Sequence, residues 1–181
     1  MDKKDNRASG AVKKYILPVL FIAFALLLDQ ITKNYAQETL SAVEGHSVPL
    51  IDGVFNFTLA TNAGAAWSMF SGSRVFLLLV TFAAFALIFY IFRAGWINTS
   101  AERWTMYSVI GGALGNLYDR LFREGGLVID FFDFELINFP VFNVADIFIS
   151  VGGVLFILFF FIDTIKSGKS AADKEQENDN H

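Results

Sequence analysis

Several charged and amide side chains of this 181-residue chain lie inside long apolar runs, where burying a polar group is energetically unfavourable. Asp146 lies within VFNVADIFISVGGVLFILFFFI, and Asn143 precedes it by three positions. In WTMYSVIGGALGNLYDRL, the spacing of Asn116, Asp119 and Arg120 places all three toward one side of a helix. A charged side chain costs about 2.5–3.5 kcal/mol at the centre of a membrane. These residues therefore need a chemical or structural reason.

Three further places in the chain carry polar or small residues next to apolar ones. Asp130 lies in the Phe-rich stretch LVIDFFDF, which we expect to dip into the membrane interface at the depth of Asp146. Asp29 and Lys33 are four residues apart, so they form either a snorkelling ion pair at a helix end or part of a site. The segment NAGAAW begins at Asn62, and its glycine, Gly64, permits close approach of a ligand to the backbone.

Carboxyl groups are the chemistry that these positions offer most abundantly. Two carboxyls in one low-dielectric site do not both ionise, so they share a proton. One of them then activates water while the other protonates the leaving group, as in aspartic proteases. Asp146 has two candidate partners, Asp119 and Asp130, and spacing alone leaves that choice open.

Other catalytic chemistries fit the sequence less well. The chain has no cysteine, and its two histidines, His46 and His181, lie in a predicted loop and in the tail. A zinc site and a Ser–His–Asp triad therefore lack their ligands and base. A Ser–Lys dyad would need Lys33 uncharged, which the neighbouring Asp29 disfavours. We expect neither a metal nor another cofactor.

The elements that hold these residues are predicted to be membrane-spanning helices. Hydrophobic residues make up 54% of the chain, charged residues 18%, and mean hydropathy is +0.47. A spanning helix needs about 20 mostly apolar residues. Four runs qualify, the third being the weakest because it is rich in glycine, and they predict a bundle of four transmembrane helices. The spans are residues 15–36, 75–92, 104–121 and 141–162.

Basic residues predict how the chain is oriented. Ten of the 14 Lys and Arg residues fall on the side that holds both termini, so we expect both termini to be cytoplasmic. Residues 1–14 are then a cytoplasmic tail, 15–166 the membrane domain and 167–181 a disordered cytoplasmic tail. The formal charge of −4 gives no indication of nucleic-acid binding.

A small β-sheet is predicted on the outer membrane surface, after the first span. Ser47–Ile51 and Val54–Leu59 read as strands that flank the hairpin turn Asp52-Gly53. Pro49 makes the first strand short or places it at an edge. The long outer segment between the first two spans therefore carries structure of its own.

Taken together, these motifs resemble the lipoprotein signal peptidases, the type II signal peptidases of bacteria. The resemblance covers nearly the whole chain outside the two tails, and Trp67 replaces the phenylalanine commoner in that family. Five blocks in order among four spans are a specific signal. The blocks are DQITK at 29–33, NAGAAW at 62–67, GGALGNLYDR at 111–120, VIDF at 128–131 and FNVAD at 142–146.

The resemblance implies an aspartic endopeptidase of the cytoplasmic membrane. Such enzymes remove the signal peptide of prolipoproteins before a diacylglyceryl-modified cysteine, at the outer face of the membrane. Carried over, Asp130 and Asp146 are the catalytic pair, which decides the choice left open above. Partners are the lipid-modified substrate and membrane lipid, with the enzyme a monomer. The residues implied to bind substrate or support the site are Asp29, Lys33, Asn62, Gly64, Asn116, Asp119, Arg120 and Asn143.

One alternative function comes from a different class. A small proton or ion transporter would also place Asp and Arg residues within its helices. Its pathway would need polar residues that reach both membrane faces. Here they gather toward the outer ends of the first, third and fourth spans, which favours a peptidase.

Overall fold

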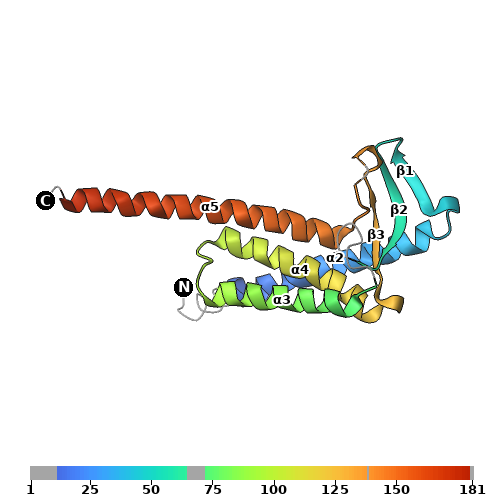
Figure 1. Ribbon diagram of the computed structural model, residues 1–181, viewed down its shortest axis with the longest axis horizontal. Coiled ribbons are helices and arrows are strands. Elements are labelled where there is room, and N and C mark those ends of the chain that lie inside the picture. Colours follow the sequence, from blue (N-terminus) through green and yellow to red (C-terminus); the bar gives the residue numbers. More distant parts are fainter. Residues whose placement is uncertain (1–11, 65–71, 138, 180–181) are drawn as a thin grey trace, which may run out of the picture.

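The computed structural model describes residues 12–64, 72–137 and 139–179. Figure 1 shows long helices running side by side, with a small sheet at one end of them. The described helices are η1 Val12–Ile16, α2 Leu17–Leu40, α3 Arg74–Arg93, α4 Ser100–Phe122 and α5 Val144–Asp179, and the strands are β1 Ser47–Ile51, β2 Phe55–Asn62 and β3 Val128–Asp133. Three-residue helical turns occupy Glu44–His46, Glu124–Gly126 and Glu135–Ile137.

Three of the four predicted spans form helices that are long and apolar enough to cross a membrane. In the described residues these are Lys14–Leu40, Arg74–Arg93 and Val144–Gly168, with mean hydropathies of 2.0, 2.8 and 2.5. Helix α4 has 23 residues, but it does not reach the same hydropathy because one of its faces is polar. The protein is therefore a mostly helical membrane protein with three candidate spans and a small sheet.

Helix α4 packs against both α2 and α5 through glycines. A side chain at Gly111 would collide with Ala25 of α2, and one at Gly112 would collide with the backbone oxygen of Ala145 in α5. Gly115 faces the carboxylate of Asp29 with equally little room. Small residues at this seam let the three backbones approach closely, as is common between membrane helices.

A capping box explains why α4 begins four residues before the predicted start of its span. Thr99 Oγ1 accepts a hydrogen bond from the backbone of Glu102 (3.2 Å), and Glu102 Oε2 accepts one from the backbone of Thr99 (2.9 Å). The pattern Thr-x-x-Glu is a sequence signal for a helix start. It lies outside the apolar run, which is why hydropathy alone places the boundary too late.

The sheet has the antiparallel order β1-β2-β3. The predicted hairpin is confirmed, with Gly53 at a positive φ of 68° in the turn and β1 at an edge. The third strand, β3, is an element that the sequence analysis missed. It pairs with β2 so that Asp130 lies opposite Ala60, a partner 70 residues earlier in the chain. Such long-range pairing leaves no local periodicity to detect.

The end of the chain differs from the prediction of a disordered tail. Helix α5 continues to Asp179, beyond the ends of the other helices in Figure 1. Residues 169–179 contain neither proline nor glycine and are rich in Ala, Lys, Glu and Gln, which favour helix. The polarity of residues 169–179 predicted disorder, whereas their high helix propensity allows α5 to extend through them.

Candidate active site

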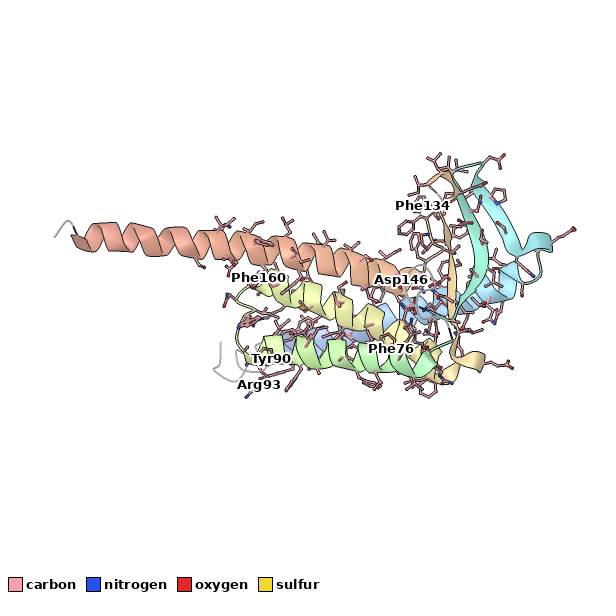
Figure 2. All side chains as sticks on the ribbon, in the orientation of Figure 1. Phe76, Tyr90, Arg93, Phe134, Asp146 and Phe160 are labelled. Carbon is pink, nitrogen blue, oxygen red and sulfur yellow. The ribbon has the colours of Figure 1, made fainter. Side chains whose placement is uncertain are left out.

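Asp130 and Asp146 lie on different elements and meet at Asn143. Asp130 is in the middle of β3 and 2% exposed, whereas Asp146 lies half-buried in the first turn of α5. The side-chain amide of Asn143 donates to Asp130 Oδ1, and its backbone N–H donates to Asp146 Oδ2 (3.2 Å). One residue therefore holds both carboxylates, at the end of α5 nearest the sheet (Figure 2).

The start of α5 explains why Asn143 and Asp146 take these positions. Asn143 Oδ1 accepts a hydrogen bond from the backbone of Asp146 (3.0 Å), while Asp146 accepts one from the backbone of Asn143. This reciprocal arrangement is that of a helix capping box. The spacing of three residues in FNVAD is thus a local signal that also orients a candidate catalytic group.

Asn116 of α4 connects the two carboxylates to a second, deeper group of charges. Its Nδ2 donates to Asp146 Oδ1 (2.8 Å), and its Oδ1 accepts from Asn143 Nδ2 (3.2 Å) and Lys33 Nζ (2.9 Å). An asparagine can serve as donor and acceptor at once without adding charge. It therefore joins acids and a base inside the protein.

Lys33 is fully buried between two aspartates. Its Nζ lies 2.8 Å from Asp29 Oδ2 and 2.8 Å from Asp119 Oδ2, and all three side chains are 0% exposed. Asn116 Oδ1 accepts a hydrogen bond from the same ammonium group, so three oxygens surround Lys33 Nζ. Asp29 also accepts the backbone N–H of Ala145 (2.9 Å). The interpretation of Asp29 and Lys33 as a snorkelling pair is therefore wrong.

Two residues of this group were not predicted from the sequence. Gln30 Nε2 lies within hydrogen-bond distance of Asp29 Oδ2 (3.1 Å) and Asp119 Oδ1 (3.0 Å). Arg123 Nε donates to the same oxygen of Asp119 at 2.7 Å, and the rest of its guanidinium group binds α2. The spacing of Asp119 and Arg123, four residues apart, could have indicated that pair. Nothing local points to Gln30.

Asn62, Gly64 and Arg120 complete the network on the side of the sheet. Asn62 Nδ2 donates to Asp130 Oδ2 (3.1 Å), and the Gly64 backbone donates to Asn62 Oδ1 (2.8 Å). Arg120 donates to the Gly64 carbonyl (3.1 Å), which brings its charge into the site. All ten site residues predicted from the sequence thus belong to one connected network. Trp67, which ends the same motif, lies outside the described residues.

The surroundings of Asp130 favour its protonated form. Burial raises the pKa of this carboxyl to about 7, and the negative charge of Asp146 acts in the same direction. Hydrogen bonds from Asn62 and Asn143 and the charge of Lys33 oppose that rise. A carboxyl with a pKa near neutrality can give or take a proton under physiological conditions, as general acid–base catalysis requires.

Comparison with known proteins agrees with this geometry. The family model described as signal peptidase (SPase) II matches residues 21–162. The chain belongs to the signal peptidase II family. A lipoprotein signal peptidase of Trichormus variabilis is 42% identical over 141 residues, covering 76% of this chain and 84% of the relative. One of Clostridium acetobutylicum is 37% identical over 158 residues, covering 84% and 99%.

Solved structures agree as well. A bacterial membrane enzyme superposes with a TM-score of 0.73 at 31% identity, covering 83% of this chain and 91% of the other. The resemblance inferred from the five sequence blocks is confirmed, and this signal peptidase II is a protease of the bacterial membrane.

Proposed function

We propose that this signal peptidase II removes signal peptides from prolipoproteins with Asp130 and Asp146 as its catalytic pair. The reaction is supported by membership of the family, and the roles of the two residues are supported by their contacts in the site. The main support is that Asn143 donates a hydrogen bond to each carboxylate, although β3 and α5 are separate elements. In this proposal the two acids, both bound by Asn143, act on a common water molecule.

In this mechanism the pair holds one proton at neutral pH. The raised pKa of Asp130 supports Asp130 as the protonated member. Asp146, which accepts N–H groups from Asn116 and Asn143, then takes a proton from water as the water oxygen attacks the scissile carbonyl. Asp130 donates its proton as charge develops in the reacting peptide. As the C–N bond of the tetrahedral intermediate breaks, Asp146 gives its proton to the leaving amine, and a hydroxyl of the intermediate returns a proton to Asp130.

The placement of the polar network supports a site at the outer membrane face. The network lies at the sheet end of the helices, whereas α2 begins and α5 ends at the opposite end (Figure 1). We propose both termini in the cytoplasm and α4 as the fourth span. Its polar face is covered, since Asn116 and Asp119 are at most 7% exposed. A polar helix shielded in this way can cross a membrane.

The proposed substrate carries a diacylglyceryl group on the cysteine that follows the cleaved bond. Phe55 and Phe134 of the sheet region pack together (ring centroids 4.9 Å apart), and Phe134 is 39% exposed. Apolar side chains beside the site suit lipid and a lipid-modified peptide. We expect the unmodified precursor to be a poor substrate, because each buried CH₂ is worth about 0.8 kcal/mol.

The deciding experiment uses purified enzyme and a diacylglyceryl-modified prolipoprotein. Asp130→Asn and Asp146→Asn should each lower kcat by roughly 10²–10⁴-fold or more, since general acid–base catalysis contributes that much. Asp133→Asn is the matched control on β3, where Asp133 accepts a hydrogen bond from Thr58. Asp163→Asn is the control on α5, where Asp163 accepts one from Asn98.

Both controls should keep near-normal turnover, and all four variants should unfold at a similar temperature. Near-normal cleavage by either Asp130→Asn or Asp146→Asn would exclude that residue from the pair. Equal loss in a control would show that any carboxylate change harms the enzyme.

A further inference from the structure

A polar cavity lies at the end of the helices remote from Asp130 and Asp146. It has a volume of about 470 Å³ and is formed by η1, the starts of α2 and α4, the end of α3 and the loop between α3 and α4. Figure 2 places Tyr90 and Arg93 at this end of α3 and Asp146 at the other end of the bundle. The volume falls within the range of about 300–1,000 Å³ typical of small-molecule sites.

The charges that line this cavity are all positive. Lys14 and Arg103 line its exposed rim, with the Lys14 ammonium 5.1 Å from the centre of the Tyr15 ring, and none of its described lining residues is acidic. Among the described residues, neither side chain belongs to an ion pair. Glu102, the acid next to Arg103, is 0% exposed and binds the backbone N–H groups of Asn98 and Thr99. The cavity is thus suited to an anion.

The remaining lining residues of the cavity provide hydrogen-bond donors and aromatic rings. Ser100 and Tyr107 supply hydroxyl groups, and Trp104 supplies an indole ring. Trp104 packs edge-on against Phe21 (5.4 Å between centroids) and Tyr107 (5.8 Å), so its ring is held in place. Tyrosine and tryptophan concentrate where membrane helices meet water. A ligand here would have a charged part in the cavity and an apolar part along the helices.

We propose that this cavity binds the phosphate of an anionic phospholipid in the membrane leaflet opposite the active site. Basic pockets between membrane helices bind acidic headgroups through the same combination of charge and hydrogen-bond donors. The inference goes beyond the peptidase reaction and uses none of its residues. It requires that the helices span the membrane, and its test is independent of cleavage.

The test measures lipid binding to the full chain in detergent by native mass spectrometry. The probes are phosphatidylglycerol, phosphatidylcholine with the same acyl chains, and glycerol phosphate. Wild-type protein should retain phosphatidylglycerol in preference to phosphatidylcholine. The variant Lys14→Gln/Arg103→Gln should bind phosphatidylglycerol roughly thirtyfold more weakly, since each basic group near a membrane contributes roughly fivefold.

Two further variants make the result specific. Arg93→Gln removes a positive charge at the same end of the bundle but outside the cavity lining, and it should leave the preference unchanged. Ser100→Asp places a negative charge inside the cavity at the first residue of α4, where acidic residues favour a helix. It should therefore fold and still lose phosphatidylglycerol.

Unchanged lipid preference in the double variant and in Ser100→Asp would overturn the proposal. An equal loss in Arg93→Gln would also overturn it, because the effect would then be general surface charge. Binding of glycerol phosphate as strong as that of the lipid would assign the cavity to a free phosphate ester instead.

Discussion

At the scale of single residues, the site is a balance of buried charges joined by amides. The site contains four carboxyl groups and three basic side chains. If all seven were ionised, the site would have a net charge of −1. The proposed sharing of a single proton by Asp130 and Asp146 would remove that excess and give the state that acid–base catalysis needs. The carboxylates are those of Asp29, Asp119, Asp130 and Asp146, and the cations those of Lys33, Arg120 and Arg123.

The raised pKa of Asp130 predicts how activity depends on pH. Asp130 is protonated below about pH 7 and loses its proton above, so kcat/KM should fall as pH rises through that value. The hydrogen bond from Asn62 lowers this pKa. In Asn62→Leu the pKa rises further, so the alkaline limb of the pH–rate profile should move to higher pH.

Asn56→Leu is the matched control for that experiment. Asn56 lies on the same strand but donates to Glu135, away from the carboxylates. Its pH profile should match that of wild-type enzyme. An alkaline limb that stays in place or moves to lower pH in Asn62→Leu would contradict the role of Asp130.

Lys33 predicts a large effect on stability. Lys33→Met leaves Asp29 and Asp119 buried without their shared cation, which costs about 3–5 kcal/mol in free energy of unfolding. Lys166→Met removes an exposed lysine of α5 and should change stability by less than about 0.5 kcal/mol. Chemical denaturation of the two variants in the same detergent measures both. A loss in Lys33→Met no larger than that in Lys166→Met would disprove the electrostatic role of Lys33.

At the scale of elements, α4 is the helix on which the site depends. It contributes Asn116 and Asp119, and it reaches α2 and α5 only because its glycines leave room for their backbones. Three of its positions, Gly111, Gly112 and Gly115, are buried. The glycine seam and the site therefore depend on each other, since close helix approach brings Asp29 of α2 to Ala145 of α5 and Lys33 of α2 to Asp119 of α4.

Gly115 and Gly153 offer a direct comparison of two helical glycines. A methyl group at Gly115 would collide with the Asp29 carboxylate, which Lys33 and Ala145 hold in place. Gly115→Ala should destabilise the protein by about 1–3 kcal/mol, as overpacking does. Gly153→Ala meets no atom within 4 Å and should stabilise α5 by roughly 0.5–1 kcal/mol. Unfolding in matched detergent measures both, and equal effects would contradict the packing account.

At the scale of the whole molecule, the polar network and the sheet occupy one end of the bundle, and apolar helix surface separates that end from the polar cavity at the other. Helix α3 illustrates the apolar part, because only Leu77 is buried among its 20 residues. Exposed apolar helices suit lipid, whereas charged side chains need protein around them. This asymmetry supports an active site near one membrane face and argues against a pathway that crosses from face to face.

The absence of cysteine makes the proposed topology easy to test. Glu44→Cys places a thiol at an exposed position of the outer segment, and Ser167→Cys places one at an exposed position of α5. A membrane-impermeant maleimide should label position 44 in intact spheroplasts, and position 167 only after permeabilisation. The unmodified chain is the control for background labelling. The reverse pattern would invert the proposed orientation.

Much of the molecule was predictable because its signals are local. Apolar runs predicted the four long helices, the Asp52-Gly53 turn predicted the hairpin, and five blocks of residues predicted the family. Hydropathy did not predict the start of α4 or the extension of α5, because capping and helix propensity set those boundaries. In β3, Val128, Ile129 and Phe131 favour a strand, but its pairing with β2 has no local signal. Nothing local distinguishes Gln30 from its neighbours.

Residue types and their order along the chain were enough to predict four helices, an acid-rich site and a peptidase family. Spacing alone did not separate Asp119 from Asp130 as the partner of Asp146; the family resemblance favoured Asp130. In three dimensions Asp119 is bound by Lys33 and Arg123, whereas Asp130 shares Asn143 with Asp146. That difference depends on contacts of α2 with α4 and of β3 with the start of α5. Spacing within one element does not encode such contacts, because they form only when distant segments pack together.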